Sequence, residues 1–591
     1  MKLNMRKDVP VELTWDLSLL YATEEEMLSD FEKAKELSLQ LEKEYKGKLT
    51  DAAAICRCLA AYEKLSVILE HVANYTELAV EVDYYDTHNQ ELQGRFQSAA
   101  AEMAARLTFI DTEILQCPDS IIREAMNAAP AAAPYLEDLL RQKPHHLSPQ
   151  TEQVLAAMSP VLQAPYQVYN MTKLADMKFD SFTVDGKEYP LGYSLFEDNY
   201  EYEVDTGVRR AAFAAFSAKL KEYENTTAAA YNAQVTADKV MATVRGFDSV
   251  FDYLLHDQKV TREMYDRQID LITERLAPYM RAYAKKLQQA HGLDKMTFAD
   301  LKLAMDPEFD PRVTIPQAKE YLKKGLSILG DDYVAMVEEA FDQRWIDFAK
   351  NQGKCTGGFC ASPYQKNSYI LLSWNERMSD VFTLAHELGH AGHFRRCQKE
   401  QSIFGTNVSG YLVESPSTMN ELIFAQYLLG TSEDPRFRRW VYSSMIGHTY
   451  YHNFVTHLRE AWFQREVYRI VDAGGSVNAE VLNDLFRKNL EVFWGDAVEL
   501  PEGAELTWMR QPHYYMGLYS YTYSAGLTLA TQASLRIQKE GQPAVEDWKA
   551  MLSAGGTLDP VGLGKLAGID LTSEQALIDT IDYIGSIIEQ I

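Results

Sequence analysis

The stretch His386-Glu387-Leu388-Gly389-His390 decides what kind of fold and site this chain builds. Residues four apart lie on one face of a helix, so His386 and His390 are placed to grip a single metal ion. Glu387 lies about 100° further round the helix and flanks the open position of that metal. Two imidazoles one turn apart beside a carboxylate are typical of a zinc hydrolase, so the stretch predicts a helix that carries a zinc site.

The residues around this motif predict a buried helix. No proline interrupts residues 375–398, and apolar side chains recur at helical spacing. These apolar residues are Val381, Phe382, Leu384, Ala385, Leu388 and Ala391. Gly389 and Gly392 each weaken a helix by about 1 kcal/mol relative to alanine, a cost that is explained if another backbone approaches closely there. We expect that neighbour to be a second helix with a metal ligand.

Glu414, which lies 24 residues after His390, is the expected third ligand. The polar, glycine-bearing stretch 399–410 is long enough to reverse the chain, and Pro416 favours the first turn of a new helix. A ligand set of two histidines and one glutamate leaves one tetrahedral position for water, as in catalytic zinc sites. Glu421 follows seven residues later on the same face, where it either orients a liganding histidine or is a solvated helix charge.

Several further segments accompany the zinc motif. They are Trp15-Asp16-Leu17-Ser18, the region from Gly357-Gly358-Phe359-Cys360 to Tyr369-Ile370-Leu371-Leu372, Glu414-Ser415-Pro416-Ser417, and a tyrosine-rich stretch after His513. In this combination the chain resembles oligoendopeptidase F, of the thimet-oligopeptidase-like zinc metallopeptidases. The resemblance implies that His386, His390 and Glu414 bind one Zn²⁺ per chain and that Glu387 is the general base. It also implies a mainly α, two-lobed fold with a deep substrate channel.

The tyrosine-rich stretch holds five tyrosines within residues 514–523. Hydrolysis of a peptide bond develops negative charge on the carbonyl oxygen, and phenol or imidazole donors stabilise such charge. The resemblance implies that a histidine and tyrosines of this segment take that role. We expect His513 and Tyr521 to do so, followed by Tyr514, while the other tyrosines pack a helix interface.

Residues 367–374 are rich in β-forming side chains and are bounded by polar turns, which predicts a strand and a small β-sheet beside the active-site helix. An exposed strand edge binds an extended peptide through its main chain, whatever the peptide's sequence. Gly357 and Gly358 suit a close backbone approach. We therefore predict that Gly357, Gly358 and Tyr369 bind substrate; the alternative is a small structural hairpin.

The rest of the chain predicts a large helical protein. Of 591 residues 46% are hydrophobic, and long stretches show apolar helical periodicity. Those stretches are 24–41, 52–82, 208–221 and 262–287. Asp185-Gly186 between two short β-rich runs predicts a hairpin. We expect an amino-terminal helical lobe over residues 1–195, ending in this hairpin region, and a catalytic metallopeptidase domain over residues 196–591.

Charge and composition narrow the partners and the location. Lysine and arginine number 58 against 85 acidic residues, a net charge of -27, which gives little support to nucleic-acid binding. Residues 1–16 lack the apolar core of a signal peptide, and no run of 18 apolar residues is present to span a membrane. With six scattered cysteines, a reducing cytoplasm is the expected location.

The function implied by the resemblance is hydrolysis of internal bonds of oligopeptides, with water as nucleophile. One alternative is a zinc carboxydipeptidase of related fold, which needs a cationic group for the terminal carboxylate. The other is a catalytically silent peptide-binding protein, which has no need of Glu387 beside an open zinc position. His448 and His452 repeat the four-residue spacing without a nearby base or third ligand, so we expect no second metal site there.

Overall fold

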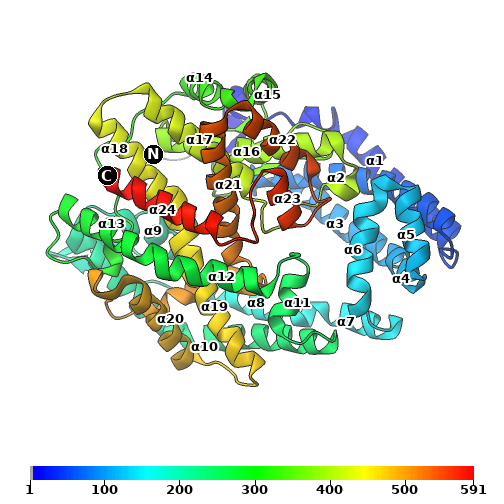
Figure 1. The fold of residues 1–591 in the computed structure, drawn as a ribbon, viewed down its shortest axis with the longest axis horizontal. Helices are drawn as coiled ribbons and strands as arrows, with labels where there is room; N and C mark the ends of the chain where they lie inside the picture. Colours follow the sequence, from blue (N-terminus) through cyan, green and yellow to red (C-terminus); the bar gives the residue numbers. More distant parts are fainter. Residues whose placement is uncertain (1–3) are drawn as a thin grey trace.

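The computed structural model describes residues 4–591 and confirms a mainly α fold. Its hydrophobic side chains form two cores. The smaller core spans residues 15–139 and includes Tyr369 and Leu371 from the later sheet, whereas the larger begins at Met177. Figure 1 shows the helices of the smaller core, in blue, at one end of an elongated molecule. No helix within residues 4–591 has both the length and the apolar character required to cross a bilayer.

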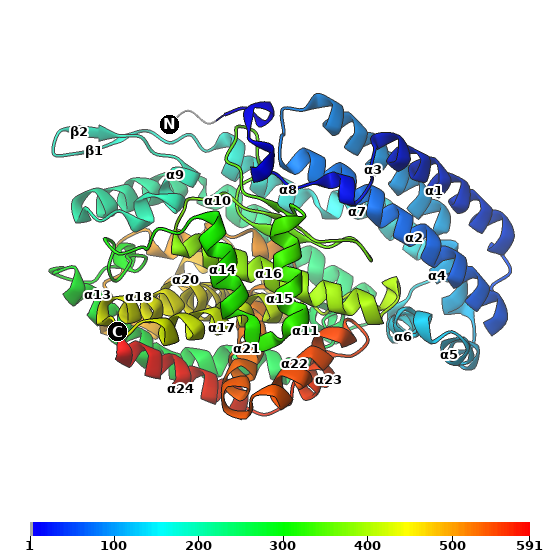
Figure 2. The same cartoon turned by 90° about the horizontal axis from the view of Figure 1, so that it is seen from above.

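The smaller lobe is a layer of long helices whose first turns are capped by side chains. Thr23, Asp51 and Asp86 each accept a hydrogen bond from a backbone N–H of the helix that follows. Figure 2 shows the three longest helices of this lobe, the first three in chain order, side by side. The helices of this lobe are α1 (Glu24–Tyr45), α2 (Ala52–Glu81), α3 (Thr87–Leu107), α4 (Phe109–Gln116), α5 (Asp119–Ala128) and α6 (Ala133–Gln142).

The remainder of the chain surrounds the candidate site with helices from distant parts of the sequence. In chain order up to the site these are α7 (Pro149–Leu162), α8 (Ala164–Asn170), α9 (Tyr193–Asp198), α10 (Thr206–Val244), α11 (Val250–His256), α12 (Arg262–Leu271), α13 (Ala277–Ala290), α14 (Ile315–Gly325), α15 (Asp331–Asp342) and α16 (Met378–Glu400). After it come α17 (Ser415–Thr431), α18 (Pro435–Ser444), α19 (His457–Asp472), α20 (Ala479–Trp494), α21 (Ser520–Glu540), α22 (Gln542–Ala554), α23 (Pro560–Leu566) and α24 (Gln575–Gln590).

The hairpin predicted around Asp185-Gly186 is confirmed. Strand β1 (Phe182–Val184) pairs antiparallel with β2 (Lys187–Tyr189). Asp185 and Gly186 have φ of 51° and 78°, the left-handed values that a two-residue hairpin turn requires. Phe182 belongs to the larger core, so the hairpin packs with the later helices. The division of the chain at residue 195 stays a prediction.

A three-stranded sheet lies beside α16, as predicted, but the strand within residues 367–374 is not at its edge. The order is β3 (Ile346–Asp347), β5 (Tyr369–Leu371), β4 (Phe359–Ala361), so β5 is the central strand. Its three residues are fully buried, and Tyr369 packs edge-on against Trp15. The prediction that residues 367–374 offer a free edge was therefore wrong, because apolar side chains on both faces favour a central position. The outer strand on that side is β4.

Helices α16 and α17 approach each other at Gly389. A Cβ built on Gly389 lies 2.3 Å from the carbonyl oxygen of Pro416 and 2.5 Å from Cα of Ser417. This confirms that the glycine admits the backbone of a second helix. Pro416 lies in the first turn of α17, where its missing N–H costs no hydrogen bond. The crossing brings Glu414, just before α17, next to the histidines of α16.

Candidate metal centre and active site

Three side chains converge at the crossing of α16 and α17. Nε2 of His386 and Nε2 of His390 each lie 3.3 Å from Oε2 of Glu414. Zinc bonds of about 2.0–2.1 Å in a tetrahedron place neighbouring ligand atoms about 3.3 Å apart, so this spacing fits one zinc ion. His386, His390 and Glu414 are also a group whose ligand atoms lie within 4.8 Å of one another. The donor set suits zinc, and the sequence had indicated these three residues.

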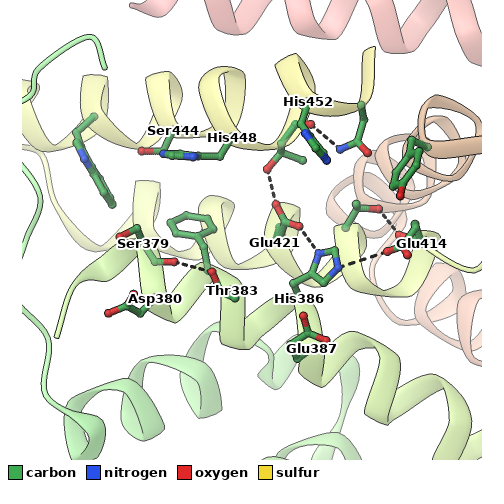
Figure 3. Close-up of a pocket in the computed structure, with 16 residues that line it drawn as sticks. Ser379, Asp380, Thr383, His386, Glu387, Glu414, Glu421, Ser444, His448 and His452 are labelled. Atoms are coloured by element: carbon green, nitrogen blue, oxygen red, sulfur yellow. Dashed lines mark hydrogen bonds and ion pairs between the residues drawn. The ribbon is translucent and has the colours of Figure 1, made fainter. Parts of the chain in front are cut away.

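Glu421 forms a hydrogen bond with His386 on the side of the ring away from Glu414. The imidazole donates from Nδ1 to Oε1 of Glu421 over 2.6 Å, and the hydroxyl of Thr449 donates to the other carboxylate oxygen. Figure 3 shows this chain running from the upper helix through Glu421 to His386. The contact confirms that Glu421 orients a histidine, and it leaves Nε2 of His386 directed at Glu414.

Glu387 lies beside the three converging residues with 5% of its surface exposed. Burial raises the pKa of its carboxyl, an effect that His386 and His390 partly offset. Its Oε1 lies 3.3 Å from a Cβ built on Gly358, so a larger residue at that position crowds the carboxylate. Gly358 immediately precedes β4, and the outer strand of the sheet therefore begins next to Glu387.

A cavity of about 580 Å³ contains His386, Glu387, Glu414 and Glu421. Its opposite wall is a π-helical segment, η12 (Met445–Thr456), which exposes His448 and His452 to the cavity. Figure 3 shows Ser444 and His448 facing Ser379 and Thr383 of α16. π-Helical turns are rare and occur often at functional sites. The sequence did not indicate that His448 and His452 line the site, and the expectation that they form no second metal site stays a prediction.

The tyrosine that lines this cavity is Tyr523. Its ring lies 5.2 Å from that of Tyr519 and 5.7 Å from that of His513, measured between centroids. His457 stacks on it at 4.0 Å with an interplanar angle of 16°. Tyr519 and Tyr523 are four residues apart at the start of α21, so they share one helix face.

Tyr521 and Tyr514 lie elsewhere. Tyr521 lies two residues from both Tyr519 and Tyr523, so its side chain points to the other side of α21. There it is 1% exposed, donates a hydrogen bond to Gln258 and packs edge-on against Tyr265. Tyr514 is also 1% exposed and packs against Tyr231. Neither lines the cavity with the converging residues. The helical phase of residues 519–523 was the signal that separates Tyr523 from Tyr521.

His513 is held by a buried carboxylate. Oε2 of Glu460 accepts from Nδ1 of His513 at 3.3 Å, from Nδ1 of His457 at 2.9 Å and from Ser520 at 3.0 Å. Burial alone raises the pKa of Glu460, but the two imidazoles outweigh it and hold the pKa at about 2. His457 in turn contacts His452 through their Nε2 atoms at 3.0 Å. These hydrogen bonds account for the cluster, and we assign no metal to it.

A helical two-lobed fold with a 2-His, 1-Glu centre and an adjacent carboxylate defines a metallopeptidase. The sequence profile of Peptidase family M3 matches residues 199–583, and that of Oligopeptidase F matches residues 113–179. The chain belongs to peptidase family M3.

Curated relatives match over nearly the whole chain. Oligopeptidase PepF of Bacillus subtilis is 28% identical over 97% of this chain and 86% of its own length. Oligoendopeptidase F of Lactococcus lactis subsp. cremoris, the plasmid form, is 26% identical over 97% of this chain and 95% of its own.

Solved structures share the fold. A crystal structure from Chlamydophila abortus matches with a TM-score of 0.87 at 20% identity, covering 100% of both chains. The crystal structure of oligoendopeptidase-F from Enterococcus faecium matches with a TM-score of 0.73 at 23% identity, covering 95% of this chain and 97% of that one.

Proposed function

We propose that this chain is a zinc-dependent endopeptidase that hydrolyses internal bonds of oligopeptides. The observation that carries the proposal is the convergence of His386, His390 and Glu414 at 3.3 Å with Glu387 beside them. Membership of peptidase family M3 and relatives named oligoendopeptidase F support the same activity. One Zn²⁺ per chain and a cytoplasmic location remain predictions, and all six cysteines are free thiols.

His386, His390 and Glu414 would hold the zinc, with Glu421 fixing the ring of His386. The ion, when bound, supplies a Lewis acid that polarises the scissile carbonyl and makes water acidic enough to react at neutral pH. Glu387 removes a proton from the attacking water and returns it to the leaving amine. Its burial favours this exchange, because a raised pKa brings the carboxyl closer to the pH at which the proton must move in both directions.

The negative charge that develops on the carbonyl oxygen needs donors on the other side of the cavity. We assign this role to His513 and the hydroxyl of Tyr523, with Tyr519 beside them, in place of Tyr521 and Tyr514. Tyr523 lines the cavity, whereas His513 does not line it and stands behind Tyr523 with ring centroids 5.7 Å apart. Glu460 binds Nδ1 of His513, so its Nε2 is the nitrogen left to donate.

The main chain of the peptide is expected to lie along β4. As the outer strand it has backbone groups that β5 does not use, and an added strand satisfies them without regard to side chains. Gly357, with φ of 87°, and Gly358 lead into this edge next to Glu387. Tyr369 is buried in the smaller core, so in this proposal it stabilises the sheet and does not touch the peptide.

The two alternatives make different demands on the site. A silent binding protein does not require a buried carboxylate beside three converging ligands, and this chain has one in Glu387. A carboxydipeptidase removes residues stepwise from the carboxyl terminus, whereas the Lactococcus lactis relative is named an oligoendopeptidase.

Digestion of a mixed set of oligopeptides and one folded protein, read by mass spectrometry, tests the proposal. We expect internal cuts in the short peptides, no cuts in the folded protein, abolition by a chelator and recovery with zinc. Stepwise terminal losses would replace the endopeptidase with the carboxydipeptidase. Absence of cleavage by the zinc-loaded protein would overturn the proposal that the chain is an enzyme.

A further inference from the structure

The cavity that holds the catalytic residues continues into a second cavity of about 340 Å³. The two share four lining residues, which are Ser379, Trp440, Ser444 and His448. Ser379 stands near the start of α16, seven residues before His386. At 1.5 Å per residue the second cavity therefore opens about 10 Å along the helix from the candidate metal ligands.

The acidic side chains that line the second cavity already have cationic partners. Both oxygens of Asp306 accept from Arg436, at 2.6 and 2.9 Å. Oδ2 of Asp310 accepts from Arg377 at 3.2 Å. The charges of these two carboxylates are thus matched by arginines.

Lys302 is different. It lines the same cavity, is partly buried, and forms no ion pair or hydrogen bond through its ammonium group with any residue in the range 4–591. The positive charge of Lys302 helps to lower the pKa of Glu201. Oε1 of Glu201, however, accepts a hydrogen bond from Arg510 at 2.8 Å. Arg510 also pairs with Glu197, so Lys302 offsets part of the negative charge of these two glutamates without a direct ion pair to either. Its ammonium group is therefore left without a direct hydrogen-bond acceptor among residues 4–591.

The surroundings of Lys302 suit an anion attached to a peptide. The Lys302 ammonium group lies over the ring of Tyr451, 5.9 Å from its centroid. Trp440 supplies an apolar wall, and Ser444 supplies a hydroxyl. Desolvation lowers the pKa of the His448 imidazole, which favours the neutral ring with one N–H to donate. A carboxylate bound here would accept a charge-assisted hydrogen bond from the Lys302 ammonium group.

We propose that Lys302 binds a carboxylate of the peptide substrate about three residues from the scissile bond. The spacing is that of Ser379, which lines both cavities about 10 Å of helix from His386, divided by about 3.3 Å per residue of an extended peptide. The carboxylate is either the peptide's own terminus or an aspartate or glutamate side chain. This subsite rests on the proposed peptidase activity and adds a preference to it.

The test uses a neutral parent peptide whose cut bond has been mapped with the zinc-loaded enzyme. Aspartate is placed singly at positions two to four on either side of the cut, and shortened peptides ending at the corresponding positions are made as free acids and as amides. Each aspartate peptide is paired with the neutral parent, and each free acid with its amide. For each pair, kcat/KM of the peptide with the carboxylate is divided by kcat/KM of the neutral peptide, in wild type, Lys302→Gln, Lys302→Arg and Lys33→Gln. Lys33 is an exposed lysine of α1 and is the matched control.

We expect one position at which the carboxylate raises kcat/KM by about tenfold through KM, the size of a partly desolvated charged hydrogen bond. The ratio should fall to about one in Lys302→Gln, survive in Lys302→Arg and stay at the wild-type value in Lys33→Gln. A preference confined to free-acid peptides identifies the terminus as the ligand, and one confined to aspartate identifies the side chain. A wild-type ratio near one throughout, or a ratio that survives in Lys302→Gln, overturns the subsite while the peptidase stands. If the zinc-loaded enzyme cleaves none of the neutral peptides screened for a parent, the peptidase and the subsite are both overturned.

Discussion

Glu421 accepts the Nδ1 proton of His386 over 2.6 Å and at the same time accepts the hydroxyl proton of Thr449. This carboxylate ties η12 to α16 and leaves only Nε2 of His386 available to a metal. The ligand geometry therefore depends on a residue that does not touch the ion.

Glu421→Gln should weaken zinc binding by about 10- to 100-fold, because an amide is a weaker acceptor for the imidazole proton. Competition with a chromogenic chelator measures the change. Glu433→Gln, on an exposed residue beyond the end of α17, is the matched control and should bind zinc as the wild type does. Unaltered affinity in Glu421→Gln would show that the contact does not position the ligand.

Tyr523→Phe should lower kcat by about 10²-fold or more with little change in KM, as expected for loss of a donor that acts on the transition state. Tyr521→Phe removes a buried hydrogen bond to Gln258 and should cost about 1 kcal/mol of stability while kcat is retained. Steady-state kinetics and thermal melting of both variants separate the two roles. The reverse pattern would return the assignment to Tyr521.

Much of the metal site could be predicted from sequence because its rules are local. Helical spacing fixed the relation of His386 to His390, and the helix-weakening Gly389 indicated that another backbone crosses there. The proline at 416 marked the start of the helix that follows Glu414.

The errors came from information that is not local. The order of strands in a sheet depends on tertiary contacts, so the sequence could not show that Tyr369 lies inside and β4 outside. Helical spacing places Tyr521 and Tyr523 on different faces of α21, about 200° apart, but which face meets the cavity depends on tertiary packing. The contact of Glu460 with His513 joins residues from separate helical segments, and spacing does not predict it.

Gly389→Ala should separate α16 from α17, since its Cβ would lie 2.3 Å from the Pro416 carbonyl oxygen. We expect a loss of about 1–3 kcal/mol of stability together with weaker zinc binding. Gly430→Ala, in α17, meets no atom within 4 Å and should be neutral or slightly stabilising through helix propensity. Melting temperature and zinc content are the measurements. A Gly389→Ala protein that melts and binds zinc normally would contradict the tight crossing.

Asp238, on α10, should make stability fall as pH rises. Burial raises the pKa of this carboxyl to about 6, although Tyr468 and Gln234 donate hydrogen bonds to it. A folded-state pKa above the unfolded value means that the protonated form is favoured on folding. The stabilisation is present below about pH 4 and is lost by about pH 6, up to about 3 kcal/mol.

Asp238→Asn should therefore gain stability over wild type progressively between pH 4 and pH 6, and keep that gain at higher pH. Thermal midpoints at matched ionic strength test this, with Asp180→Asn as the control at a 96% exposed side chain. An advantage of Asp238→Asn that is constant across this range would show that Asp238 does not titrate as its burial requires.

The most direct test of the central claim is to measure zinc content and turnover together in Glu387→Gln and His390→Ala. Glu387→Gln should bind one zinc per chain and lose activity by about 10³-fold, because the ligands remain and the proton acceptor is gone. His390→Ala should lose both the metal and the activity. Turnover near the wild-type value in zinc-loaded Glu387→Gln would contradict the assignment of Glu387 as base, and stoichiometric zinc with ordinary affinity in His390→Ala would contradict the ligand set.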